Sequence, residues 1–144
     1  MGAAGQPALS AEAQAALDRR LWAAAHKGDA AAIERLAAEG ASPNAKGEYG
    51  DPAVYMAAAK GHAGAVSALV RLGADLDATD SWGHTALMGA AEYGQVECAR
   101  ALLAGGADRT LRATGGPDKG KTALEIAEEK GKAAHAEVEA LLRH

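Results

Sequence analysis

The stretch GHTALMGAA, residues 83–91, decides the fold of this chain. It begins with a turn glycine, Thr85 supplies a hydroxyl of the kind that caps helix N-termini, and helix-forming residues follow. This pattern predicts a short helix over residues 86–93, ended by the next glycine. A second short helix is expected over residues 96–104, where a Gly-Gly pair ends it, and turn chemistry rich in Asp, Thr and Gly comes next.

The same signals recur along the chain at an interval of 33 residues. The positions in step are Gly28, Gly61 and Gly94; Gly40, Gly73 and Gly106; Leu36, Leu69 and Leu102; and Leu21, Val54 and Leu87. Several registers sharing one period indicate a repeat architecture, in which each unit of two antiparallel helices and a turn buries its apolar face by stacking on its neighbours. The opening helix is expected to begin near Ser10 and to run to about His26.

Two quoted segments carry a resemblance to a known family. Residues 83–91 resemble the ankyrin segment G-x-T-P-L-H-x-A-A, and residues 73–78, GADLDA, resemble its G-A-D-x-N-A turn. Residues 50–58 and 120–127 repeat the first segment more loosely, so roughly residues 17–144 are similar to ankyrin-repeat proteins. The resemblance implies an all-α solenoid of stacked helix pairs with projecting β-hairpin loops. The expected boundaries are a disordered tail over 1–9 and a domain over 10–144, with repeats at approximately 10–46, 47–79, 80–112 and 113–144.

The chain departs from the family pattern at three places. Alanine replaces the pattern's proline at Ala53, Ala86 and Ala123. The interval between Gly94 and Gly131 is 37 residues, so the third loop has four extra residues. The last helix carries Leu141 and Leu142 two places beyond the expected register, and we expect this end to form an atypical cap.

Composition narrows the function classes. The 144 residues suit one domain, and a net charge of −4 argues against nucleic acid as a main partner, because phosphate neutralisation needs a basic surface. The single cysteine, Cys98, fits a reducing compartment. No apolar run approaches the ~20 residues of a membrane span, and the first ten residues lack signal-peptide features. We therefore expect a cytoplasmic, monomeric protein without membrane contact.

All five aromatic side chains occupy positions that the resemblance places on or near the partner-binding concave side. Tyr49 and Trp82 share one slot at the loop tips, Trp22, Tyr55 and Met88 share one slot on the first helix of each pair, and Tyr93 ends such a helix. Trp and Tyr supply large contact areas at low entropic cost, which makes them candidate binding anchors. The alternative is that they fill the groove structurally. Filling is favoured for the Trp22 slot, and binding is favoured for Tyr49 and Trp82, because a loop tip has little core to fill.

Charged side chains complete the predicted partner-binding set: Asp51, His84, Arg112, Lys119 and Lys121. The first two loops are mainly acidic and the third is mainly basic. Such an asymmetry can orient a partner and speed its encounter. The alternative is a set of solvated loops with no partner.

Residues 115–122, GGPDKGKT, match the phosphate-loop motif G-x-x-x-x-G-K-[ST] letter by letter. A phosphate loop follows a buried strand, and no apolar strand precedes Gly115. The repeat register explains the same letters, since Gly120 matches Gly50 and Gly83, and Thr122 with Glu125 forms a capping box. Nucleotide or anion binding by this loop is therefore the alternative, not the main prediction.

The sequence predicts a protein without catalytic function, cofactor or metal. The histidines show no ligand spacing, and Cys98 lacks a basic neighbour to activate it. The expected function is non-catalytic protein–protein interaction, as an adaptor or inhibitory partner, through loop tips and the concave inner-helix face. A self-associating structural module is a further alternative.

Overall fold

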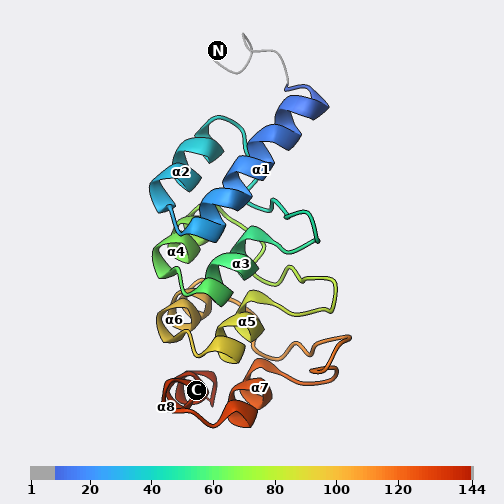
Figure 1. The fold of residues 1–144 in the computed structure, drawn as a ribbon. Helices are drawn as coiled ribbons and strands as arrows, with labels where there is room; N and C mark the ends of the chain where they lie inside the picture. Colours follow the sequence, from blue (N-terminus) through green and yellow to red (C-terminus); the bar gives the residue numbers. More distant parts are fainter. Residues whose placement is uncertain (1–8, 144) are drawn as a thin grey trace.

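The computed structural model describes residues 9–143, so the expected tail lies outside the described residues except for Leu9. Over this range the chain forms eight helices. In chain order they are α1 (Ala11–Lys27), α2 (Ala30–Ala38), α3 (Ala53–Lys60), α4 (Ala63–Arg71), α5 (Ala86–Tyr93), α6 (Val96–Ala104), α7 (Ala123–Lys130) and α8 (Ala133–Arg143). Figure 1 shows them as four stacked pairs, with α1, α3, α5 and α7 in an inner column and α2, α4, α6 and α8 in an outer one. Three loops project to one side of the inner column.

Local signals set the helix ends as predicted. The Ser10 side chain accepts a hydrogen bond from the N–H of Ala13 at the start of α1, and Thr85 accepts one from Met88 at the start of α5. The glycine after each inner helix adopts the left-handed conformation, which only glycine adopts without strain. These glycines are Gly28, Gly61, Gly94 and Gly131.

The loops project as expected, but their strand pairing is minimal. Within residues 9–143 it amounts to one isolated bridge between Lys46 and Pro52. Each loop is closed instead by one or a few backbone hydrogen bonds, such as Asp80 N–H to the His84 carbonyl at 3.0 Å and Ala113 N–H to the Lys121 carbonyl at 3.0 Å. Glycine, proline and aspartate in these segments favour turns over extended ladders.

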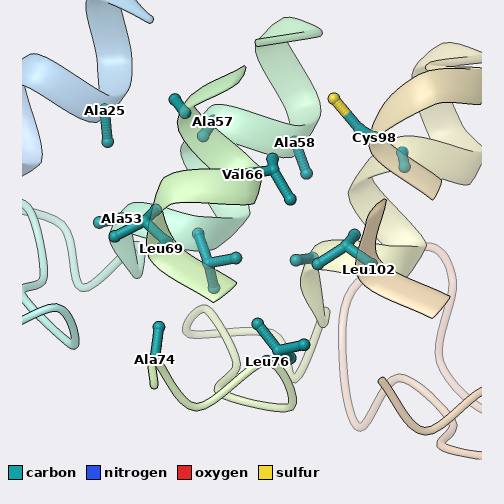
Figure 2. Packing of buried hydrophobic residues seen from close by; sticks show 14 of the residues in the cluster. Ala25, Ala53, Ala57, Ala58, Val66, Leu69, Ala74, Leu76, Cys98 and Leu102 are labelled. Carbon is teal, nitrogen blue, oxygen red and sulfur yellow. The ribbon is translucent and has the colours of Figure 1, made fainter. Parts of the chain in front are cut away.

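The core runs continuously between the two helix columns and is built largely from alanine. Ala53, Ala57 and Ala58 of α3 are fully buried, beside Val66 and Leu69 of α4 (Figure 2). A methyl side chain lets helix backbones approach closely, so a thin two-layer stack can be packed without large aromatic residues. The composition therefore suits the layer thickness of the fold.

A row of side chains ties each helix pair to the previous one. His62 Nε2 donates to the His26 carbonyl at 3.1 Å, Gln95 Nε2 to the Ala59 carbonyl at 3.2 Å, and His135 Nε2 to the Glu92 carbonyl at 2.9 Å. These carbonyls lie at equivalent positions of α1, α3 and α5. Each bond satisfies an orphan carbonyl at a helix end, which stabilises the stacking of neighbouring repeats.

The last repeat differs from the others, as the slipped leucines predict. Helix α8 has 11 residues, whereas α2, α4 and α6 have 9. Leu142 is buried and Leu141 is half-buried, and Arg109 Nη1 donates to the carbonyls of both at 3.0 and 3.2 Å. The expected atypical end therefore lies on a longer terminal helix whose last carbonyls are bound by the third loop. No helix among the described residues is both long and apolar enough to cross a membrane.

Candidate partner-binding groove

Two adjoining cavities lie between the loops and the inner helices, and together they form what we call the groove. The first cavity has a volume of about 570 Å³, and its lining residues include Asp51 and Tyr93. The second has a volume of about 400 Å³ and extends to Lys130 on α7. Tyr55, Asp80 and Tyr93 line both cavities, so the two are continuous. The groove spans three repeats. Of the predicted partner-binding residues, Trp22, Tyr49, Arg112 and Lys119 line neither cavity.

Three aromatic side chains on the loops and on α5 are exposed, and two of them line the groove. Tyr49 at the tip of the first loop is 80 % exposed, Trp82 at the tip of the second is 54 % exposed, and Tyr93 at the end of α5 is 57 % exposed. Trp82 and Tyr93 line the groove. Large exposed aromatic side chains that lie within reach of one cavity are typical of interaction surfaces.

Trp82 is also the point where the extended third loop meets the second. Its carbonyl accepts hydrogen bonds from the N–H groups of Thr114 at 3.2 Å and Gly115 at 3.0 Å. Its indole lies against Gly116, where a Cβ atom would come within 2.9 Å of the ring. The four extra residues of the third loop therefore support Trp82 from one side and leave its other surface exposed.

The three residues that share the first-helix slot have different environments. Trp22 Nε1 donates to the Asp51 carbonyl at 2.8 Å, and its ring packs on Gly47 of the first loop. Tyr55 is half-buried and lies against Gly89 of α5, where a Cβ atom would be 3.0 Å from the ring. Met88 is 1 % exposed and belongs to the core. Met88 therefore packs in the core, Trp22 is half-buried against the first loop outside the two cavities, and the half-buried Tyr55 lines the groove.

His84 is an internal tie between loops and offers little surface to a partner. It is 8 % exposed, with Nδ1 3.4 Å from Asp80 Oδ1 and Nε2 3.1 Å from Asp118 Oδ2. The contact joins the second loop to the third. This role was not predicted, because nothing in the sequence shows that positions 84 and 118 meet.

The basic side chains of the third loop are largely neutralised by neighbouring carboxylates. Lys121 pairs with Asp118 at 3.7 Å and with Glu129 on α7, and the Glu129 hydrogen bond raises the pKa of the lysine. Arg112 donates to the Gly120 carbonyl at 2.7 Å and to Glu125 at 3.0 Å. The exposed Lys119 forms no ion pair within residues 9–143. The predicted acidic-to-basic asymmetry is therefore weaker than the sequence indicates.

The phosphate-loop match has the hydrogen bonds of a repeat loop. The N–H groups of Gly115, Lys119, Gly120 and Lys121 all donate to carbonyls of this chain, and Thr122 N–H donates to Glu125. A phosphate loop needs such N–H groups free to face the anion. The predicted capping box between Thr122 and Glu125 is present at the start of α7. This geometry opposes nucleotide binding by the loop.

The thiol of Cys98 is a poor nucleophile in this structure. Cys98 is buried, and burial together with Glu97 raises the pKa of its thiol to about 11. A thiol of that pKa is protonated and unreactive near neutral pH. Among residues 9–143, no three His, Cys, Asp or Glu side chains lie together in a way that could hold a metal ion.

The sequence did not single out Asp80 and Gly89, which line the groove. It also did not show that Gly47, Gly89 and Gly116 make room for the rings of Trp22, Tyr55 and Trp82. A glycine in a helix interior or beside a loop tip is a weak signal for such a contact, since it does not name the ring that fills the space.

Comparison with protein families agrees with the geometry. The family model described as ankyrin repeats, in three copies, matches residues 21–113. Among individual curated proteins, none matches the chain in sequence. The match covers α1 from Leu21 through α6 and into the third loop, and it stops before the four-residue extension and the longer α8. With four stacked helix pairs in the described part of the chain and a family match over more than half of its length, this chain belongs to the ankyrin-repeat family.

Proposed function

We propose that this chain is a monomeric, non-catalytic module that binds another protein through its groove and loop tips, as an adaptor or an inhibitory partner. Ankyrin repeats are in general protein interaction modules, which supports the coarse assignment. The single observation that carries the finer one is the exposure of Trp82 and Tyr93 beside Tyr55 in one continuous groove. Binding energy at protein interfaces concentrates on such anchors.

The proposed contact surface comprises Tyr49, Tyr55, Trp82, Tyr93 and Asp51, with Arg112, Lys119 and Lys121 at the edge formed by the third loop. Met88, Trp22 and His84 support this surface from within. Met88 and His84 are almost fully buried, so a partner has little of either side chain to desolvate. Trp22 is half-buried, as Tyr55 is, but it lines neither cavity of the groove.

The test is capture of partners from a source lysate with the intact chain and with a Trp82→Ala, Tyr93→Ala variant. The matched control is Arg100→Ala on α6, whose exposed side chain contacts Glu97 on the outer column. We expect the same proteins to be retained by the intact chain and the control, and lost with the double variant. Equal retention by all three would refute binding through the groove.

The two alternative functions, self-association and nucleotide binding, can each be measured directly. Sedimentation of the intact chain over a range of concentrations is expected to show one monomeric species, and a concentration-dependent dimer would support the self-associating module. Titration with ATP and magnesium is expected to release no binding heat, because the N–H groups of Gly115 and of residues 119–122 already donate within the chain. Stoichiometric binding would restore the nucleotide alternative.

A further inference from the structure

The groove has an excess of negative charge that its own lysines do not neutralise. Five carboxylates and three lysines line it. Lys121 pairs with Asp118 and Glu129, and Lys130 pairs with Glu92 at 3.6 Å. The remaining charged groups are Asp51, Asp80 and the exposed Lys60. Within residues 9–143 neither of these carboxylates forms an ion pair with a lysine or arginine.

These two carboxylates repel one another. Partial burial raises the pKa of Asp51, and the charge of Asp80 raises it further. Asp80 Oδ1 accepts hydrogen bonds from the N–H groups of Trp82 and His84, which hold this carboxylate in place at 2.9 and 2.8 Å. The loop therefore keeps the Asp80 carboxylate in a position where it repels Asp51. A cation placed between the two carboxylates would relieve this repulsion.

The walls beside the carboxylates suit an organic cation with an apolar stem. The rings of Tyr55 and Tyr93 line the same 570 Å³ cavity, together with the side chains of Met56 and Ala59. Tyrosine faces attract ammonium and guanidinium groups, and apolar walls bury their methylene stems. A divalent metal ion would instead need several oxygen ligands around one point, which the described residues do not assemble.

We propose that the groove receives a lysine or arginine side chain from an extended segment of a partner protein, seated between Asp51 and Asp80 with Tyr55 and Tyr93 along its stem. This inference rests on the proposed function and names the chemistry of the partner. An extended segment suits the groove because the first cavity continues into the second, so residues beside the basic one can lie along it. Nucleic acid and anionic lipid are negatively charged, as the carboxylates are, and are therefore repelled by them.

The test is selection of a displayed library of random dodecapeptides on the intact chain and on an Asp51→Asn, Asp80→Asn variant. The matched control is Glu39→Gln, Glu137→Gln, which changes the net charge equally at two exposed positions of the α2 end and α8. Both variants are expected to fold. The amide oxygen introduced by Asp80→Asn can accept the same loop hydrogen bonds, and Asp51→Asn removes the repulsion. Their melting curves check this before selection.

We expect peptides selected on the intact chain and on the control to share one lysine or arginine at a fixed position. That residue should disappear from peptides selected on the double Asp→Asn variant, and its replacement by Gln should weaken binding to the intact chain about tenfold or more. Peptides that bind the groove without a conserved basic residue would overturn this inference and leave the proposed function standing. A basic residue that survives selection on the double Asp→Asn variant, or the absence of any selected peptide, would overturn it as well.

Discussion

One glycine slot shows how a single methyl group can matter at one repeat and not at another. Gly50, Gly83 and Gly120 occupy equivalent positions before their inner helices, and all have positive φ, at 85°, 74° and 83°. A Cβ atom at Gly50 or Gly120 would meet nothing within 4 Å. At Gly83 a Cβ atom would lie 2.7 Å from the backbone nitrogen of Thr114, whose N–H donates a hydrogen bond to the Trp82 carbonyl.

We therefore expect Gly50→Ala and Gly120→Ala to cost about 1–2 kcal/mol each, the strain of a left-handed residue with a side chain. Gly83→Ala should cost at least about 1 kcal/mol more, because it also displaces the third loop from Trp82. Urea unfolding of the three variants measures the difference. Equal losses of stability at all three positions would show that the loop contact contributes nothing.

Trp82 is the residue whose replacement should affect binding and stability most differently. With its indole more than half exposed, Trp82→Ala should lower the unfolding free energy by about 1 kcal/mol or less. It should cost about 2 kcal/mol or more in binding once a partner is identified, if the side chain anchors the interface. Paired melting and affinity measurements make the comparison. A variant that melts much earlier would instead show that the contact with the third loop, not recognition, is the main role of the indole.

At the scale of an element, the start of α7 links a helix cap to pH. Hydrogen bonds from Thr122 lower the pKa of Glu125 below its ordinary value of 4.5, and Arg112 lowers it further. A carboxyl group whose pKa is lower in the folded than in the unfolded chain stabilises the fold at pH values above its unfolded-state pKa. This stabilisation is lost as the pH falls through the folded-state pKa.

The melting temperature of the intact chain should therefore fall on acidification from about pH 6 to pH 3 partly because of Glu125. Glu125→Gln retains a hydrogen-bonding side chain at this position of the capping box but does not titrate, so its melting temperature should fall less steeply. The control is Glu137→Gln on α8, whose slope should match that of the intact chain. Identical slopes for all three proteins would contradict the linkage.

At the scale of the whole molecule, the stack has two unequal ends. The long α1 begins one end, whereas the other ends in α8, where His135 Nδ1 is buried without a hydrogen-bond partner among the described residues. An unsatisfied buried polar group costs about 1–3 kcal/mol, and a terminal repeat has a neighbour on one side only. We therefore expect the C-terminal repeat to open first.

Hydrogen exchange can measure this directly. Amide groups in α7 and α8 should exchange faster than those in α3 and α4, which have neighbours on both sides. A His135→Gln variant, in which an amide replaces the imidazole, provides a comparison, since Gln95 makes the same kind of bond one repeat earlier. Residues 123–143 as well protected as residues 54–71 would refute the expected order of opening.

Much of this fold could be predicted from the sequence because its signals are local. Helix caps at Ser10, Thr85 and Thr122, and glycines that end the inner helices, act within a few residues and therefore appear in the sequence itself. The 33-residue period then determined how the helix pairs stack, since one apolar face repeated in step can be buried only by its neighbours.

Only the tertiary structure decided which side chains of one sequence slot reach the groove. Trp22 packs on Gly47 of its loop, whereas the loop position equivalent to Gly47 in the next repeat is Asp80, and Tyr55 instead lies against Gly89 of the next helix. Met88, which occupies the same slot in the third repeat, is buried in the core. The slot is the same in all three repeats, but the space beside it is set by residues 25 to 34 positions away, and only folding brings them into contact.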